Sequence, residues 1–545
     1  MNQAQKTVVI VGGVAGGMSA ATRLRRHDES MRIIVLEKSG YVSFANCGLP
    51  YYLGGVIEER DSLLLQTPES LAQRFELDVR VNSEVLSIDR AAQAIDVKIA
   101  AGTETLNYDE LILSPGATPF VPPLPGVEQA LTLRTVEDVD AIMARTHELP
   151  SGASVAVVGG GFVGLEVAEN LSHRGFHVSL VEAAPHVMAP LDTEIAALVH
   201  RALRDGGVDL YLGEALAEIR QSKIKLASGS EVPADMVILA IGVRPDSRLA
   251  AGAGLALSER GGILVDEHMR TSDPHIYAVG DAVEKRDALS GQGVLVALAN
   301  TANLQGRLVA DVIAGRPVAQ RPVRGTSILG LFGMTAASVG WNERRLKQEG
   351  RDYRAIHTHP SDHAGYYPGA SGMSLKLLVD SATDEILGAQ GVGESGVDKR
   401  IDVIATAMAG GLRASDLAEL ELAYSPQFGS AKDPVNMLGY INRNIRDGLV
   451  QTVQFHELQD ELDAGALLVD VRTPGEFTHS PIPGAVNIEL DALRERLGEL
   501  EIDRPIIVHC QVGLRGYLAA RILNQHGYQV RNLDGGWKTW NSAQQ

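Results

Sequence analysis

The stretch Val155-Ala156-Val157-Val158-Gly159-Gly160-Gly161-Phe162-Val163-Gly164 decides the fold of this chain. An apolar strand runs into a Gly-x-Gly-x-x-Gly turn, and a helix follows to about His173. The first glycine makes the tight turn, the second lets backbone approach a pyrophosphate, and the third lets strand and helix pack closely. A second apolar strand ends in Glu182, eighteen residues after Gly164. This order predicts a parallel, doubly wound nucleotide-binding sheet.

The acid at the end of the second strand also predicts which nucleotide binds. A carboxylate at Glu182 is placed to accept hydrogen bonds from both ribose hydroxyls, and it would repel a 2′-phosphate. Ala183 and Ala184 follow it, with no Arg to hold such a phosphate. The sequence therefore favours NADH over NADPH. A glycine turn without a ligand is the alternative, and the complete strand, helix and acid argue against it.

A less regular copy of this pattern lies at the N-terminus, where Val14 takes the place of the middle glycine. Glu37 ends the second strand of this copy, twenty residues after Gly17. Asp281 ends a later strand, where its carboxylate could hold the ribityl chain of a flavin. Two nucleotide sites in one chain predict a relay from NADH to FAD. The glycines of the first turn are Gly12, Gly13, Gly16 and Gly17.

Composition limits the classes of protein that this chain can be. It has 545 residues, of which 45% are apolar, and this suffices for three or four packed domains. The net charge is −19, and no basic stripe occurs, so no nucleic-acid partner is expected. No apolar run of about 18 residues could span a membrane, and no signal peptide is recognised. The expected location is the cytoplasm.

The chain has two cysteines, Cys47 and Cys510, and no C-x-x-C pair. This pattern excludes a disulfide framework and leaves two thiols for chemistry. No metal site is predicted, because His357, His359 and His363 form no recognisable ligand set and are expected to be solvated loop histidines. The cluster Glu343-Arg344-Arg345 is interpreted as a solvated helix face, and residues 442–447 as a linker.

Four segments resemble the flavoprotein pyridine nucleotide–disulfide oxidoreductases, over residues 1 to about 445. The segment Ser43-Phe44-Ala45-Asn46-Cys47-Gly48-Leu49-Pro50 is similar to the single-cysteine branch of this family, which contains the coenzyme A–disulfide reductases. The resemblance implies that FAD and NADH bind here and that Cys47 is catalytic. The four segments are Gly12–Gly17, Ser114–Pro119 with Gly116, Ile241–Pro245 with Gly242, and Tyr277–Asp281.

A lone active-site cysteine restricts the chemistry. Cys47 must form a mixed disulfide with a small thiol, or cycle through a sulfenic acid or a persulfide. A nearby helix N-terminus and charge transfer to the flavin are expected to favour its thiolate. The peroxidase branch carries His where this chain has Ala15, which favours thiol exchange. An NADH oxidase or peroxidase, and a slow-turnover redox sensor or sulfur carrier, stay open as alternatives.

The resemblance also implies contacts with coenzyme A, as a disulfide, persulfide or related sulfane-sulfur substrate. Tyr366 is preferred to its neighbour Tyr367. In relatives the two tyrosines reach the active site from the other subunit, which implies a homodimer. The implied substrate-binding residues are Arg23, Ser43, Asn46, Tyr366 and Tyr424.

A second motif, Ile506-Ile507-Val508-His509-Cys510-Gln511-Val512-Gly513-Leu514-Arg515, is a buried strand that turns into a helix. The loop from Cys510 to Arg515 would direct successive backbone N–H groups inward and so stabilise a persulfide anion. With Leu467–Phe477 and Ile482–Ile488, it resembles a rhodanese. Phosphatases separate their Cys and Arg by five residues, whereas four stand here, which suits a single transferred sulfur.

These inferences predict an α/β protein with two doubly wound domains, an α+β dimerisation domain and a rhodanese-like α/β domain. The expected function is NADH-dependent reduction of CoA persulfide, polysulfide or CoA disulfide at Cys47, with sulfane-sulfur transfer at Cys510 and Arg515. The expected domains are 1–120 with 243–325 for FAD, 121–242 for NAD, 326–445 for dimerisation and 453–545 for rhodanese.

Overall fold

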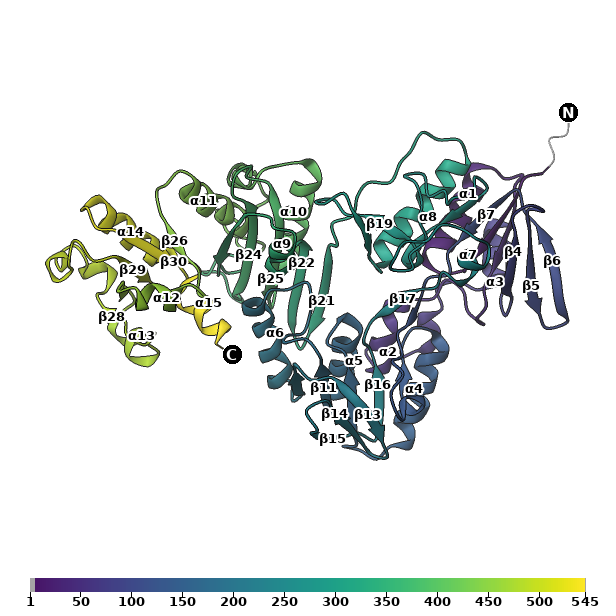
Figure 1. The fold of residues 1–545 in the computed structure, drawn as a ribbon, viewed down its shortest axis with the longest axis horizontal. Helices are drawn as coiled ribbons and strands as arrows, with labels where there is room; N and C mark the ends of the chain where they lie inside the picture. Colours follow the sequence, from purple (N-terminus) through teal and green to yellow (C-terminus); the bar gives the residue numbers. More distant parts are fainter. Residues whose placement is uncertain (1–4, 545) are drawn as a thin grey trace. The chain divides into compact units, whose positions relative to one another are not determined.

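The computed structural model describes residues 5–544 as two compact units (Figure 1). The first unit holds residues up to Ala183 together with Gly207–Arg324. The second unit holds Ala184–Gly206 together with the chain from Gly325 onward. Each unit contains two large sheets. The predicted α/β class is therefore confirmed, as are the two doubly wound domains, the α+β domain and the C-terminal α/β domain. Within residues 5–544, no helix has the length and apolar composition needed to cross a membrane.

The first sheet of the first unit is parallel, with strand order β18-β7-β1-β2-β3. Its central strands are runs of Val, Ile and Leu buried on both faces, as a sheet covered on both sides requires. Its strands are β1 (Thr7–Val11), β2 (Arg32–Leu36), β3 (Asp78–Arg80), β7 (Glu110–Leu113) and β18 (Ile276–Ala278).

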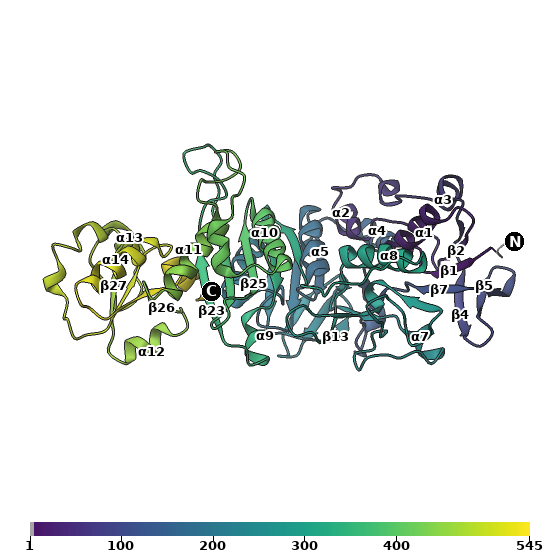
Figure 2. The same ribbon diagram turned by 90° about the horizontal axis from the view of Figure 1, so that it is seen from above.

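Two helices cover one face of this sheet and lie side by side in both ribbon views (Figures 1 and 2). They are α1 (Ala15–His27) and α8 (Ala299–Ile313). Glycine permits their close crossing, because a Cβ on Gly306 would lie 2.1 Å from the carbonyl oxygen of Gly16. The other face packs against an antiparallel sheet of β4 (Glu84–Asp89), β5 (Ala94–Ile99) and β6 (Gly102–Asn107).

The second parallel sheet of the first unit has the order β12-β11-β10-β16-β9. Paired strands β8 (Ala117–Pro119) and β17 (Val243–Pro245) mark where the chain passes between the two parallel sheets. The strands of the second sheet are β9 (Leu131–Thr132), β10 (Ser154–Val158), β11 (His177–Glu182), β12 (Asp209–Leu212) and β16 (Met236–Leu239). The remaining elements here are β13 (Leu216–Arg220), β14 (Lys223–Leu226), β15 (Glu231–Pro233), α4 (Val136–Glu148) and α5 (Phe162–His173).

Further elements of the first unit lie in its connecting segments. They are α2 (Leu49–Leu53), α3 (Pro68–Phe75), α7 (Arg248–Gly252), β19 (Glu284–Arg286) and β20 (Gly293–Leu295).

The second unit begins with an antiparallel sheet of order β21-β22-β25-β24-β23. Helix α6 (Thr193–Asp205) packs on this sheet, so residues 184–206 belong to the second unit. The chain before and after this segment belongs to the second parallel sheet of the first unit. The strands are β21 (Ser327–Leu331), β22 (Met334–Gly340), β23 (Tyr353–Thr358), β24 (Met373–Asp380) and β25 (Ile386–Gly393). The other helices here are α9 (Glu343–Gln348), α10 (Val397–Gly410) and α11 (Pro434–Arg446).

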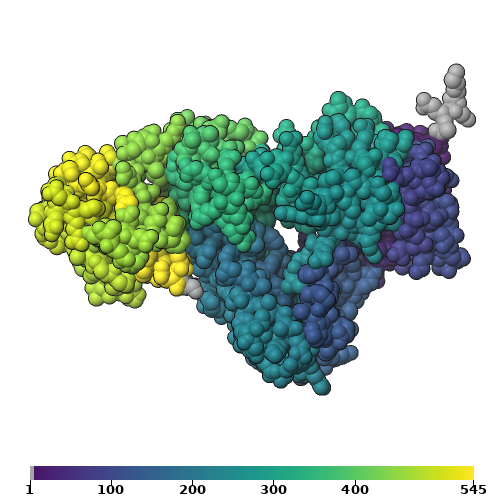
Figure 3. Space-filling model, in the orientation of Figure 1, coloured from purple at the N-terminus to yellow at the C-terminus, as the bar shows by residue number. Residues whose placement is uncertain are grey.

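The second sheet of this unit is parallel, with order β26-β30-β29-β27-β28. Its strands are β26 (Thr452–Val453), β27 (Leu467–Asp470), β28 (Val486–Asn487), β29 (Ile506–His509) and β30 (Val530–Leu533). Its helices are α12 (Leu458–Asp463), α13 (Pro474–His479), α14 (Leu514–Gln525) and α15 (Gly536–Ala543). In the space-filling view the yellow C-terminal segment, which contains α15, contacts the blue segment that contains α6 (Figure 3).

Three local predictions in the second unit are wrong in whole or in part. The predicted linker at 442–447 lies almost wholly in α11, where Asn442 is fully buried and donates to Asp384 at 2.8 Å. Within the predicted solvated face Glu343-Arg344-Arg345, Glu343 is instead buried and pairs with Lys376, whereas Arg344 is exposed as expected. His357 and His363 are buried and His359 is half-buried. A buried charge needs a partner, and each of these residues has one from a distant segment or from a neighbour.

Candidate active site

Both predicted nucleotide sites are formed by a glycine turn and by the acid that ends the next strand. The carboxylate of Glu37 accepts from the backbone N–H of Gly13 at 2.9 Å. In the same way, the carboxylate of Glu182 accepts from Gly160 at 2.6 Å. The structure therefore brings each predicted acid to its own turn, at the carboxyl ends of parallel strands.

The glycines of these turns meet two different requirements. A Cβ on Gly12, Gly17, Gly159 or Gly164 would lie within 1.9–2.4 Å of a backbone carbonyl oxygen, so no side chain fits there. A Cβ on Gly161 would meet no atom within 4 Å. That face is open to a ligand, as close approach of a pyrophosphate requires. The residues present thus fit FAD at the first turn and NAD(H) at the second.

The other predicted cofactor residues lie in or next to the two turns: a Cβ on Gly12 would meet Ser114, two residues before Gly116, and one on Gly159 would meet Ala240, two residues before Gly242. Gly16 is in α1, and Gly116 and Gly242 have positive φ values of 72° and 104° next to the β8–β17 pair. Asp281 follows β18, and its carboxylate forms an ion pair with Arg134 at 2.7 Å.

Lys285 lies near Gly280 and Asp281, and the sequence did not predict it as a site residue. It is almost fully buried, and its ammonium donates to the carbonyl of Gly280 at 2.8 Å. Burial lowers its pKa to about 8, although Asp281 acts to raise it. No sequence pattern marks a single lysine on a short strand as buried.

Cys47 is exposed on a single helical turn, Asn46–Gly48, just before α2. The prediction that its surroundings favour the thiolate is wrong for the protein groups. Partial desolvation raises the pKa of the Cys47 thiol, and the nearby carboxylate of Glu166 raises it further, whereas Arg134 acts to lower it.

Glu166 and Tyr51 form a pair next to this thiol that sequence reasoning missed. Tyr51 lies on α2 and donates from its hydroxyl to Glu166 on α5 at 3.0 Å. Burial raises the pKa of Glu166, and burial together with Glu166 raises the pKa of Tyr51. An acid two residues after the last glycine of the turn is the signal that could have identified Glu166.

The predicted substrate residues divide into two groups. In the first unit, Arg23 forms an ion pair with Asp311 at 2.8 Å, and the side-chain amide of Asn46 donates to the carbonyl of Arg134. The backbone of Ser43 has a φ of 47°, and its N–H donates to Gly13 at 2.8 Å. The bond from Ser43 to Gly13 joins the segment that carries Cys47 to the first glycine turn.

In the second unit the structure brings the two predicted tyrosines together. The hydroxyls of Tyr366 and Tyr424 are 3.0 Å apart, and the residues are 76% and 49% exposed. Tyr367 instead packs edge-on against His363. The pair is therefore formed by the tyrosine that the sequence interpretation preferred.

A pocket that the sequence did not predict opens between α1 and α8. Its volume is about 460 Å³, and two guanidinium groups face it in a chain whose net charge is −19. The two guanidinium groups suit a ligand with phosphate groups. The lining residues are Ser19, Thr22, Arg26, Asn300, Asn303, Leu304 and Arg307.

The second thiol, Cys510, is fully buried at the end of β29. Its sulfur accepts from the backbone N–H of Gly513 at 3.2 Å, and α14 begins at the next residue. Arg515 extends to Glu476, with which it forms two hydrogen bonds of 2.6 and 2.8 Å. The loop thus directs a backbone N–H group at the sulfur. The guanidinium of Arg515, which was predicted to stabilise the persulfide, forms an ion pair with the carboxylate of Glu476.

Comparisons with known proteins agree with this geometry. Residues 6–306 match the family model of the pyridine nucleotide-disulphide oxidoreductases. Residues 328–434 match the dimerisation domain of that family, and residues 454–543 match the rhodanese-like domain.

Three similar proteins cover most of this chain. Coenzyme A disulfide reductase of Staphylococcus aureus (strain bovine RF122 / ET3-1) is 36% identical over 440 residues, which are 79% of this chain and 99% of that protein. The structure of reduced Bacillus anthracis CoADR-RHD has a TM-score of 0.97 and 47% identity, and the match covers 99% of this chain and 98% of that one. An NAD-dependent persulfide reductase from A. fulgidus has a TM-score of 0.93 and 37% identity, with coverages of 98% and 100%.

The family implies FAD and NAD(H) as cofactors, in agreement with the two glycine turns. The chain belongs to the pyridine nucleotide-disulphide oxidoreductases and carries a dimerisation domain and a C-terminal rhodanese-like domain of known families.

Proposed function

We propose that this protein is an NADH-dependent flavoprotein reductase of CoA persulfide, polysulfide or CoA disulfide that also transfers sulfane sulfur at Cys510. The observation that carries this proposal is the single exposed thiol, Cys47, held against a glycine turn that fits FAD. The names of the two relatives that are reductases of CoA disulfide and of persulfide support the same chemistry.

At Cys47 the thiolate attacks the CoA sulfur of a CoA persulfide. An S–S bond forms between Cys47 and CoA, the bond to the outer sulfur breaks, and HS⁻ leaves. With CoA disulfide, the leaving group is the CoA thiolate. When FAD is bound, it supplies the two electrons of NADH that cleave the mixed disulfide into the Cys47 thiolate and CoA thiol.

Glu166 is the protein group that we assign to hold the proton of the Cys47 thiol. Its pKa is raised by burial, which brings the carboxylate closer to the range where it can accept and return a proton. Tyr51, whose raised pKa keeps its hydroxyl protonated, donates to Glu166 and orients it.

CoA carries several phosphates, and the pocket between α1 and α8 offers the matching charge. Arg26 and Arg307 are exposed there and can each hold a phosphate through two parallel hydrogen bonds. Arg23 is paired with Asp311, so we assign the phosphate contacts to Arg26 and Arg307 rather than to Arg23.

Three narrower proposals follow the same reasoning. NADH is preferred to NADPH because Glu182 would repel a 2′-phosphate. The protein is a homodimer in which the exposed Tyr366 and Tyr424 serve the Cys47 site of the other subunit. The cytoplasm is the proposed location, because both thiols must stay reduced to react.

At Cys510 the thiolate takes the outer sulfur of a donor such as thiosulfate. A Cys510 persulfide forms, the S–S bond of thiosulfate breaks, and sulfite leaves. The N–H of Gly513 stabilises the negative sulfur. Covalent linkage of the two domains raises the effective concentration of one thiol near the other.

Separate variants of the two thiols test this scheme in the FAD-loaded dimer. Cys47→Ser should abolish NADH-dependent sulfide release from CoA persulfide while FAD stays bound. Cys510→Ser should leave that activity intact and lose only transfer from thiosulfate to cyanide. Full persulfide turnover in Cys47→Ser would contradict the mechanism. If NADH is oxidised faster with oxygen or peroxide than with sulfur substrates, the protein is an oxidase or peroxidase. One turnover followed by arrest would identify a sensor.

A second arm of this experiment tests the substrate class. Arg307→Ala should raise KM for CoA persulfide about tenfold or more, since a charged hydrogen bond contributes about 1.5–3 kcal/mol. KM for cysteine persulfide, which has no phosphates, should stay the same. Equal effects on both substrates would show that the pocket does not bind CoA.

A further inference from the structure

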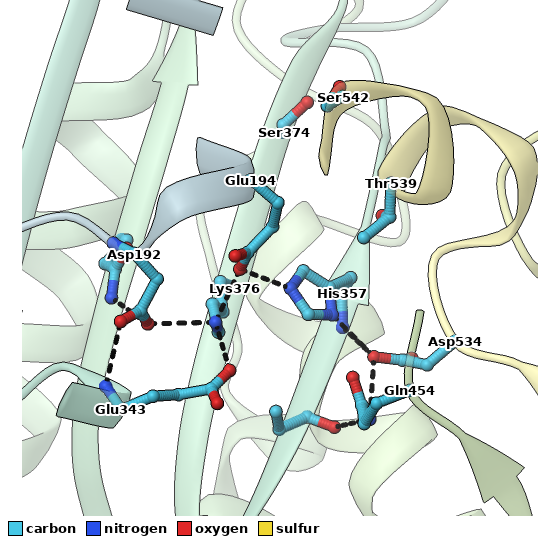
Figure 4. Close-up of polar contacts among 12 residues, drawn as sticks. Asp192, Glu194, Glu343, His357, Ser374, Lys376, Gln454, Asp534, Thr539 and Ser542 are labelled. Atoms are coloured by element: carbon cyan, nitrogen blue, oxygen red, sulfur yellow. Dashed lines mark hydrogen bonds and ion pairs between the residues drawn. The ribbon is translucent and has the colours of Figure 1, made fainter. Parts of the chain in front are cut away.

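A network of buried charges links the antiparallel sheet of the second unit to the rhodanese-like domain (Figure 4). At its centre Lys376 on β24 is fully buried and forms ion pairs with Asp192, Glu194 and Glu343 at 2.9, 2.5 and 2.5 Å. These carboxylates come from α6 and α9 and the segments next to them. The lysine ammonium therefore occupies the place where three acids could otherwise hold a metal ion.

His357 extends this network from the sheet to the rhodanese-like domain. It lies on β23, and its two ring nitrogens bond to Glu194 at 3.0 Å and to Asp534 at 2.6 Å. The backbone N–H of His357 also donates to Asp534 at 3.0 Å. Burial alone would lower the pKa of His357, but these two carboxylates raise it to about 9. Near neutral pH the ring is thus an imidazolium that donates from both nitrogens.

Asp534 begins the turn that leads into α15. Gly535 and Gly536 form this turn with positive φ values of 66° and 63°. A Cβ on Gly535 would lie 2.8 Å from the Cβ of His357, and one on Gly536 would lie 2.5 Å from the carbonyl oxygen of Cys510. The turn is therefore confined between His357 on one side and the sulfur-carrying loop on the other.

The residues after this turn hold the backbone of the Cys510 loop. The N–H of Trp537 donates to the carbonyl of Cys510 at 2.8 Å, and the N–H of Lys538 donates to that of Gln511 at 3.0 Å. Further along α15, Thr539 bonds to His359 on the segment after β23 at 2.8 Å. One short segment thus contacts both the antiparallel sheet and the loop.

We propose that His357 is a positioning residue for the Cys510 site: through Asp534 it fixes the Gly535–Gly536 turn, and that turn holds the persulfide loop in the geometry for sulfur transfer. The dimerisation domain thereby completes a site that the rhodanese-like domain carries. The reactivity of Cys510 then depends on docking of the two domains. The proposal rests on the proposed role of Cys510, but its test does not require sulfur transfer to be observed.

Two substitutions of His357 separate its two hydrogen bonds. His357→Asn places an amide nitrogen where Nδ1 lies and can keep the bond to Asp534. His357→Gln places its amide nitrogen where Nε2 lies, so it can keep the bond to Glu194 and loses the bond to Asp534. Both variants lose one buried charged hydrogen bond, so a merely structural role would affect them alike.

The full-length, FAD-loaded chain with Cys47→Ser is the background, because Cys510 is then its single thiol. We expect His357→Gln to change the rate of Cys510 alkylation by iodoacetamide about tenfold, and to speed hydrogen exchange at the Trp537 and Lys538 amides by a similar factor. His357→Asn should stay within about twofold of the background in both measurements. Equal changes in the two variants, or none in His357→Gln, would overturn the proposal.

Activity assays on chains that retain Cys47 keep the two hypotheses apart. His357→Gln should lower kcat for thiosulfate-to-cyanide transfer about tenfold with little change in KM, since a displaced catalytic group slows the reaction more than it weakens binding. NADH-dependent reduction of CoA persulfide at Cys47 should be unchanged. If the parent chain lacks either activity, the proposed function fails, while alkylation and exchange still decide the role of His357.

Discussion

At the scale of single residues, the carboxylate of Glu166 affects the ionisation of the Cys47 thiol. A negative charge next to a thiol disfavours its thiolate, and Glu166 acts in this way on Cys47. Glu166→Gln should therefore lower the pKa of Cys47 and increase its alkylation rate near neutral pH by about two- to tenfold, because one pKa unit is a tenfold change in thiolate fraction. The pH profile of alkylation should move to lower pH in a Cys510→Ser background.

Glu169→Gln is the matched control for this prediction. It removes the same charge from the same helix, α5, but Glu169 is not among the groups that shift the pKa of Cys47. Its alkylation profile should follow that of the parent. A shift to higher pH in Glu166→Gln would contradict the electrostatic explanation.

At the scale of elements, the turn between β10 and α5 contains two glycines with different roles. Gly164→Ala places its Cβ against the carbonyl of Gly159 and should destabilise the protein by about 1–3 kcal/mol, as overpacking does. Gly161 has a φ of −84°, which Ala adopts, and open space at its Cβ. Gly161→Ala should change the free energy of unfolding by no more than about 0.5 kcal/mol, as a surface substitution does. It should raise KM for NADH severalfold.

Thermal unfolding and NADH kinetics measured on the same two variants check this prediction. A large loss of stability in Gly161→Ala would show that its side of the turn is packed rather than open. An unchanged KM for NADH would show that the nucleotide does not pass over Gly161.

At the scale of the whole molecule, the proposed dimer predicts complementation between two inactive chains. Cys47→Ser lacks the thiol, and a Tyr366→Phe/Tyr424→Phe chain lacks the two hydroxyls. A mixed dimer would combine intact Cys47 from one chain with intact tyrosines from the other at one of its two sites. Random exchange of equal amounts should then restore about a quarter of the parent's activity, because about half of the dimers are mixed.

Mixing without subunit exchange is the control, and size-exclusion chromatography verifies that both variants stay dimeric. Activity no higher than the sum of the two separate variants would show that the tyrosines do not serve the partner's thiol.

Much of the fold and part of the site can be predicted from local sequence. Gly159 to Gly164 predict a turn because strand, glycine spacing and helix are contiguous, and the same holds for Cys510 to Arg515. Lys376 shows the limit of this reasoning. On β24 it is fully buried, and its carboxylate partners include Glu194, which lies 182 positions away in the chain.

The sequence by itself determined the order of strands, glycine turns and helices, and with it the two candidate nucleotide sites and the positions of the two thiols, because each of these depends on residues that are neighbours in the chain. Only the tertiary structure decided the environment of Cys47 and the charge network of His357. The ring of His357 bonds to residues 163 and 177 positions away. Burial and ion pairing depend on which distant segments pack together, and no local pattern records that.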